Sequence, residues 1–156
     1  MKNAPGLGEL LRYTAELIDS GSEAAYREMS LNYRPRYTPV LRALAAGAMT
    51  VTDITAMTHL TQGAVSQSVS LMEQDGILRR GPLEDGRKSG LHLTNSGEVL
   101  VSQLKSHWQT LFTAIHQLEK EVGWPLLQVL EQTAKALEEK DFAQRIVEAK
   151  VWGGSL

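Results

Sequence analysis

Two short helices joined by a tight turn are predicted between residues 52 and 76, and this pair constrains the fold more than any other feature of the sequence. The first helix, residues 52–58, begins with a threonine and an aspartate, which favour a helix N-terminus. After a short turn, Thr61 is expected to cap a second helix, which Gly76 ends. Two helices joined by a turn of three or four residues form a helix-turn-helix.

The second helix separates into two faces when its residues are placed at 100° per residue. Val65, Val69 and Met72 share one face, so we expect them to be buried. The opposite face carries small or uncharged side chains: Gly63, Ser66, Gln67, Ser70 and Gln74. Such a face lets a helix come close to base edges in a DNA major groove about 12 Å wide. An ordinary solvated helix face is the alternative interpretation.

A β-hairpin with a basic tip is predicted directly after the second helix. Residues 77–80 and 91–94 are expected to be strands, and the segment between them is rich in glycine. Arg87 and Lys88 stand at its tip. A hairpin in this place forms the wing of a winged helix-turn-helix.

Helices are also predicted on both sides of this lobe. They cover residues 7–29, 40–46, 95–121 and 125–151. The terminal helices carry apolar residues on more than one face, for example Trp108 with Leu111 and Phe112, and one short lobe cannot cover them all. We therefore expect an obligate homodimer.

The composition fits one soluble domain of 156 residues, of which 42% are hydrophobic. No segment approaches the roughly 18 apolar residues of a membrane span, and no signal-peptide run follows the N-terminus. We therefore expect a cytoplasmic protein without a membrane partner. The absence of cysteine excludes disulfides and thiolate metal sites.

The net charge of −2 does not by itself indicate a nucleic-acid partner, because such proteins are usually basic. The positive charge is nevertheless clustered. Residues 26–42 carry four arginines against Glu28 alone, and residues 77–94 carry four basic side chains against two acidic ones.

Catalytic and metal-binding motifs are absent. The sequence has no P-loop, dinucleotide-binding glycine pattern, cysteine nucleophile or Gly-x-Ser-x-Gly turn, so we do not expect an enzyme. His107 and His116 are nine residues apart on one predicted helix and point in opposite directions, so they cannot share a metal ion within one chain. No metal and no other cofactor are expected.

Three sequence segments, in this order and at these spacings, resemble the multiple antibiotic resistance regulator (MarR) family. They are Gly-Ala-Val-Ser at residues 63–66, Leu-Met-Glu-Gln-Asp-Gly-Ile-Leu-Arg-Arg at residues 71–80, and Asp85-Gly86-Arg87 followed by Leu-Thr-Asn-Ser-Gly at residues 93–97. The resemblance implies a mainly α-helical fold with a small β-hairpin wing.

The resemblance also implies how one MarR-like domain over residues 1–156 is organised. The winged helix-turn-helix lobe would cover about residues 36–95, and helical dimerisation arms would cover about residues 7–34 and 96–151. The two recognition helices of a homodimer would enter successive major grooves of double-stranded DNA at a pseudo-palindromic operator. The family further implies a transcriptional regulator, and we expect a repressor.

Carried over position by position, the resemblance gives a set of DNA-contacting residues: Thr61, Gln62, Gly63, Ser66, Gln67, Ser70, Arg79, Arg87 and Lys88. Gln67 has the one long amide of the polar face and can bond adenine with two hydrogen bonds. Arg87 would reach the minor groove. The alternative for Arg87 is an exposed ion pair with Glu84 or Asp85.

Regulators of this family commonly respond to a small aromatic effector. The aromatic residues that would line its crevice here are Tyr26, Tyr33, Tyr37, His107 and Trp108. The alternative is that these side chains are simply core. A rival function for the whole chain is a winged-helix module that binds another protein and has no DNA target.

Overall fold

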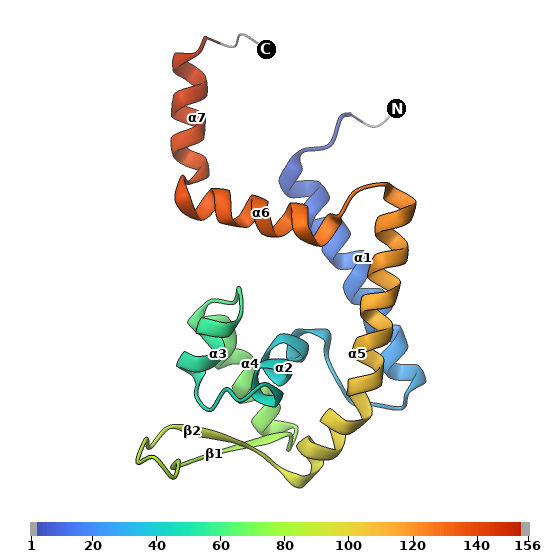
Figure 1. Ribbon diagram of the computed structural model, residues 1–156, viewed down its shortest axis with the longest axis vertical. Coiled ribbons are helices and arrows are strands. Elements are labelled where there is room, and N and C mark those ends of the chain that lie inside the picture. The colour runs from blue at the N-terminus through green and yellow to red at the C-terminus, as the bar shows by residue number, and fades with distance from the viewer. Residues whose placement is uncertain (1–2, 154–156) are drawn as a thin grey trace. The chain divides into compact units, whose positions relative to one another are not determined.

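The computed structural model describes residues 3–153, which are mainly α-helical with one two-stranded antiparallel sheet (Figure 1). This confirms the predicted fold class. Packing divides the chain into two units, residues 1–104 and 105–156, and each is described by itself. The division falls inside one long helix, α5 (Asn95–Val122).

The first unit contains the helix-turn-helix and the hairpin. Its elements in chain order are α1 (Leu7–Glu28), the 3-10 helix η1 (Pro35–Tyr37), α2 (Thr38–Ala45), α3 (Val51–Met57), α4 (Gln62–Gln74), β1 (Leu78–Gly81), β2 (Gly90–Leu93) and the start of α5. Each predicted helix and strand of this part exists, with bounds shifted by one or two residues.

The segment before α2 differs from the prediction, because η1 was not expected and α2 begins at Thr38 instead of about Val40. Pro35 and Pro39 each stand in the first turn of a helix, where an N–H group would have no intrahelical partner. The two prolines therefore start two successive helices.

A capping box starts α3 one residue earlier than predicted. Thr50, not Thr52, is the N-cap: its hydroxyl accepts a hydrogen bond from the Asp53 N–H at 3.1 Å, and the Asp53 carboxylate accepts from the Thr50 N–H at 3.2 Å. Thr52 has no acidic residue three positions later, so it cannot form this reciprocal pair. The cap of α4 is confirmed, since the Ala64 N–H donates to the Thr61 hydroxyl at 3.1 Å.

The hairpin leads directly into α5. Its strands pair in the register Leu78 opposite Leu93. The Thr94 N–H donates to the Ile77 carbonyl at 3.1 Å, and the Thr94 hydroxyl accepts from the Gly97 N–H at 3.0 Å in the first turn of α5. A Cβ atom at position 97 would collide with the Ile77 carbonyl, so this close approach requires glycine.

The core of the first unit draws on nearly all its elements. The largest fully buried side chains are Tyr26, Tyr37, Val40, Leu41, Ile54, Val65, Val69, Met72, Leu78 and Leu104. Helix α4 contacts η1, α2, α3 and β1. Four neighbours therefore fix the position of α4.

The second unit continues α5 and then contains α6 (Leu126–Glu139) and α7 (Phe142–Val151). The prediction of one helix over residues 125–151 was wrong. Lys140 has extended backbone angles, and the Asp141 side chain accepts from the Gln144 N–H at 2.8 Å, which starts a new helix. Gly123, with φ of 84°, helps to separate α5 from α6 as expected.

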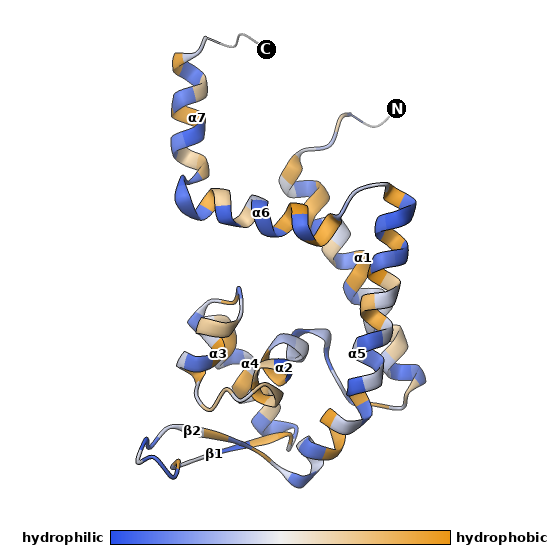
Figure 2. Cartoon of the chain, viewed as in Figure 1, coloured by the Kyte–Doolittle hydropathy of each residue, from blue (hydrophilic) through white to orange (hydrophobic). Residues whose placement is uncertain are grey.

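Helices α6 and α7 bury none of their residues, and α1 buries only Tyr26. Hydrophobic residues recur along α1 and α6 (Figure 2). Large apolar side chains at least 40% exposed on α1, α6 and α7 are Leu7, Leu10, Leu11, Tyr13, Leu17, Ile18, Leu127, Val129, Leu130, Phe142, Ile146, Val147 and Val151. In each unit these side chains exceed the scattered exposed apolar residues of a typical monomer. Among residues 3–153, no helix is long and apolar enough to cross a membrane.

Candidate nucleic-acid interface

Helix α4 presents the two faces that its sequence predicts. Val65, Val69 and Met72 have no exposed surface, which confirms the buried face. Ser68 is also buried, at 3% exposure. The helix ends at Gln74, and Gly76, two residues later, has a φ of 72°, the left-handed conformation that favours glycine after a helix.

The outward face of α4 is open, and its one charged side chain is Glu73, which pairs with Arg80 at 3.5 Å. Thr61, Gln62, Gly63, Gln67, Ser70 and Gln74 are exposed, and Ser66 is half-buried. A Cβ atom at Gly63 would meet no atom within 4 Å, so this part of the helix surface is low and free of neighbours. A flat polar surface of this kind can approach base edges closely.

Two arginines from other elements lie against this face, although α4 itself contains none. Arg36 of η1 donates through Nη2 to Gln67 Oε1 at 3.1 Å and through Nε to Ser68 Oγ at 3.4 Å. Arg80 of β1 donates to Ser70 Oγ at 3.3 Å. Both arginines belong to the basic clusters at residues 26–42 and 77–94 that the sequence shows, but nothing in the local sequence places their side chains beside α4.

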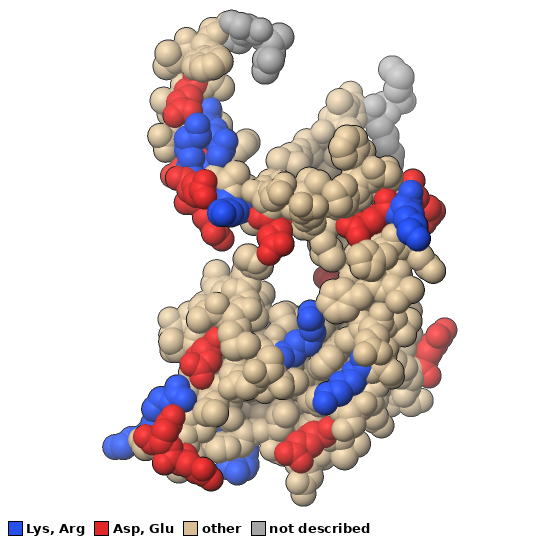
Figure 3. All heavy atoms as spheres, in the orientation of Figure 1, with Lys and Arg blue, Asp and Glu red and all other residues tan. Residues whose placement is uncertain are grey.

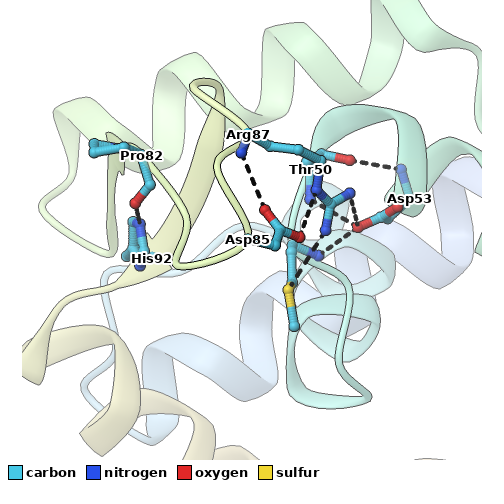
Figure 4. A network of polar contacts seen from close by, with 7 residues as sticks. Thr50, Asp53, Pro82, Asp85, Arg87 and His92 are labelled. Atoms are coloured by element: carbon cyan, nitrogen blue, oxygen red, sulfur yellow. Dashed lines mark hydrogen bonds and ion pairs between the residues drawn. The ribbon is translucent and has the colours of Figure 1, made fainter.

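The wing carries Arg87 in a network of polar contacts with α3 (Figure 4). Its guanidinium lies 2.9 Å from the Asp85 carboxylate and 3.6 Å from Asp53, and Nη2 lies 3.6 Å from the Met49 sulfur. The ion pair with Asp85, which the sequence left as an alternative for Arg87, is therefore present. No such contact joins Arg87 to Glu84 among the described residues.

Both acidic partners of Arg87 favour their charged form. The Arg87 backbone N–H, followed by its guanidinium, lowers the pKa of Asp85. The Met49 backbone N–H, with Arg87 and Thr50, lowers the pKa of Asp53. Figure 3 shows basic and acidic side chains next to each other at the tip of the hairpin. The wing is thus a mixed-charge surface.

The remaining predicted wing contacts are accessible. Arg79 on β1 and Lys88 in the loop are both exposed. The structure therefore brings the predicted DNA contacts onto one unit, within two elements and the loop between the strands. Their contact with DNA stays a prediction.

The three tyrosines proposed as effector contacts pack together. The rings of Tyr26 and Tyr33 meet edge to face with centroids 4.6 Å apart, and those of Tyr33 and Tyr37 with centroids 5.8 Å apart. The Tyr26 and Tyr33 hydroxyls lie 3.3 and 3.0 Å from the Thr38 hydroxyl, and the Tyr37 hydroxyl donates to Asp75 at 2.7 Å. These side chains are at most 6% exposed, so they form core in this structure.

Burial also controls the ionisation of two of these tyrosines. It raises the pKa of Tyr33 well above its usual value. Burial, followed by the hydrogen bond to the Asp75 carboxylate, raises the pKa of Tyr37 to about 12. Both phenols are therefore neutral at physiological pH.

His107 and Trp108, the other proposed effector contacts, lie on the part of α5 that belongs to the second unit. His107 is half-buried and Trp108 is 9% exposed. Within residues 3–153, the buried Trp108 Nε1 has no hydrogen-bond partner. In the same part of the chain, no group of three or more His, Asp or Glu side chains is placed to hold a metal ion.

Comparison with known proteins shows what the lobe is similar to. The model of the MarR family matches residues 31–89, from the segment before η1 to the loop of the wing. Among curated proteins, none matches the sequence significantly.

Several solved structures share the fold. A MarR/EmrR family transcriptional regulator from Acinetobacter sp. ADP1 superposes with a TM-score of 0.60 at 15% identity, covering 83% of this chain and 93% of its own. A MarR family transcriptional regulator from Silicibacter pomeroyi DSS-3 gives a TM-score of 0.60 at 19% identity, covering 84% and 94%. BpsR of Bordetella bronchiseptica, whose DNA binding is regulated by 6-hydroxynicotinic acid, gives 0.54 at 18% identity, covering 73% and 81%.

Proposed function

Because the lobe matches the MarR family model and the chain shares the fold of MarR regulators, we propose that it binds double-stranded DNA as a homodimer and represses transcription at a pseudo-palindromic operator. The solved structures that share the fold are transcriptional regulators, and on this ground we propose a regulator and not an enzyme. We propose a cytoplasmic location, because a repressor acts where its DNA is.

The outward face of α4 carries this proposal. It is exposed, its one charged side chain is Glu73, and four packed neighbours hold the helix in place. Gln67 supplies an amide that can read adenine, while Gly63, Ser66 and Ser70 allow the helix to approach the bases. Arg36, Arg80 and the wing supply the positive charge that α4 lacks, since phosphate contacts contribute most of the affinity for DNA.

The uncovered apolar surface supports the homodimer. Stable two-fold dimers bury one self-complementary patch on each copy. Helices α1, α6 and α7 expose many large apolar side chains on a chain of 17.2 kDa. A second copy presenting the same surface would remove it from water.

Selection of bound sequences from a random DNA pool tests the proposal. The expected result is a pseudo-palindromic site whose half-sites are about one helical turn apart. Gel shifts with this site should weaken steeply as salt increases. Binding without any sequence preference would contradict a regulator that acts at an operator.

We further propose that a small aromatic acid releases the protein from DNA. The support is the ligand regulation of BpsR and the buried Trp108 Nε1, a donor that an acceptor group of such a ligand would satisfy. The tyrosine cluster would contribute only if the ligand opened it, because its members are buried. Titration with 6-hydroxynicotinic acid, followed by Trp fluorescence and by release of labelled operator DNA, tests this proposal. Trp108→Phe removes the proposed donor, and the control variant Trp124→Phe removes an exposed tryptophan in its place.

A winged-helix module that binds another protein is the second candidate. One observation favours it: the Arg87 guanidinium is already paired with Asp85 and Asp53, which lowers the attraction of the wing for DNA. Absence of salt-dependent DNA binding would favour this candidate.

A further inference from the structure

We propose that Arg36 is a positioning residue for base recognition, because it holds the side-chain amide of Gln67 in one orientation. The inference rests on the proposed DNA-binding function and deepens it. It assigns to a residue outside the recognition helix a part in choosing the DNA sequence.

Arg36 reaches across 31 residues of sequence to two adjacent side chains of α4. Its Nη2 group donates to Gln67 Oε1 at 3.1 Å, and its Nε group donates to Ser68 Oγ at 3.4 Å. The guanidinium is a rigid planar fork, so two contacts through different nitrogens fix its orientation as well as its position.

Both ends of this arm are anchored. The η1 backbone that carries Arg36 contacts α1, α2 and α4, and the next residue, Tyr37, is completely buried. Ser68 is 3% exposed, and a buried hydroxyl is normally hydrogen-bonded. Contact with this fixed hydroxyl places the outer nitrogen of Arg36 beside Gln67.

The chemistry of arginine decides which way the amide of Gln67 turns. A guanidinium has donors and no acceptor, so it can bond the amide oxygen and cannot bond the amide NH₂ group. Adenine recognition needs one acceptor and one donor from the same amide. The carbonyl oxygen keeps a second lone pair for the base, and the NH₂ group stays directed away from Arg36.

This arrangement reduces the freedom that Gln67 must lose on binding DNA. An exposed glutamine samples many rotamers, and ordering it opposes recognition. An amide that is already held in one orientation loses less conformational freedom when DNA binds. The structure therefore predicts that removing Arg36 weakens discrimination at one base pair, whereas a simple phosphate contact would weaken binding to all sequences alike.

The test uses the full-length protein and the operator obtained by selection. Affinities for this operator and for single base-pair changes within it are measured at several salt concentrations for wild type, Gln67→Ala, Arg36→Ala and Ser68→Ala. Arg34→Ala is the matched control, because it removes the same charge two residues away. Ser68→Ala keeps the charge of Arg36, and alanine is well tolerated in a helix. Melting curves verify that each variant is folded.

Gln67→Ala should relax preference at a particular base pair. We expect Arg36→Ala and Ser68→Ala to reduce discrimination at that same base pair by roughly 3- to 10-fold, a part of what a bidentate amide contact supplies. The double variant with Arg36→Ala and Gln67→Ala should discriminate no worse than Gln67→Ala alone. Arg34→Ala should leave this discrimination unchanged.

Three results would overturn the inference. Arg36→Ala could weaken every sequence equally and reduce the slope of log K against log salt by about 2 per dimer, which marks a phosphate contact. Gln67→Ala could show no base-specific effect, in which case the proposed function still stands if wild type selects an operator. Wild type could select no sequence at all, and then the proposed function fails together with the inference.

Discussion

Asp53 at the start of α3 and Arg87 in the wing form an ion pair, with 3.6 Å between Asp53 Oδ2 and Arg87 Nη1. The same carboxylate accepts hydrogen bonds from the Met49 and Thr50 N–H groups, so one side chain caps a helix and contacts the wing. Both side chains are partly exposed, and pairs of this kind are weak. Arg87 can therefore exchange Asp53 for DNA, and the pair opposes that exchange slightly.

Asp53→Asn should strengthen DNA binding. The amide oxygen can still accept at the helix start, while the negative charge that holds Arg87 and repels phosphates is lost. We expect an affinity increase of roughly 2- to 10-fold at low salt that fades as salt increases. Asp19→Asn, which removes the same charge from α1, is the control. An equal gain in both variants would show that only net charge matters.

Arg87→Ala should weaken specific and non-specific DNA binding together. A narrow minor groove attracts a guanidinium largely independently of base identity. The slope of log K against log salt should decrease by about 2 per dimer, from about 0.9 per phosphate contact. The melting temperature should hardly change, because the ion pairs of Arg87 are exposed. Wild-type affinity with an unchanged slope would favour the protein-binding candidate.

Sedimentation at low micromolar concentration should give about twice 17.2 kDa for the wild type. Leu130 is 41% exposed on the apolar face of α6, so Leu130→Glu should shift the protein towards monomer and weaken operator binding. Gln128→Glu adds the same charge to α6 about 160° away and should stay dimeric. A wild-type monomer that binds DNA would contradict the dimer.

Alkaline pH should destabilise the protein through Tyr37. The pKa of its phenol is raised from 10.0 to about 12, so above pH 10 the unfolded chain loses a proton that the folded chain keeps. Stability is therefore complete below pH 10 and falls as pH rises to 12, by up to about 3 kcal/mol from this group. Urea unfolding at pH 8 and pH 11 measures the loss.

Tyr37→Phe should be less stable than wild type at pH 8 by about 1 kcal/mol, because the hydrogen bond to Asp75 is lost. It should lose less additional stability at pH 11. Tyr13→Phe, at an exposed tyrosine of α1, should behave as wild type. Equal alkaline losses in wild type and Tyr37→Phe would assign the effect to other groups.

Local signals in the sequence were sufficient for most helices and for both faces of α4. Thr61 and Gly76 bound α4, and the spacing of its apolar residues identified the buried side, because caps and helical periodicity depend on neighbours within about four residues. Asp141 carries the same kind of signal, an N-cap that starts α7, whereas apolar periodicity alone predicts one helix over α6 and α7.

The contacts that organise the interface were decided only by the tertiary structure. Arg36 meets Gln67, and Arg87 meets Asp53, across more than 30 residues of sequence. No periodicity connects such residues, since their meeting depends on how η1 packs on α4 and how the wing folds back to α3. The residue types on α4 and in the wing were enough to predict DNA recognition. The packing of η1 and of the hairpin decides which partner each arginine contacts.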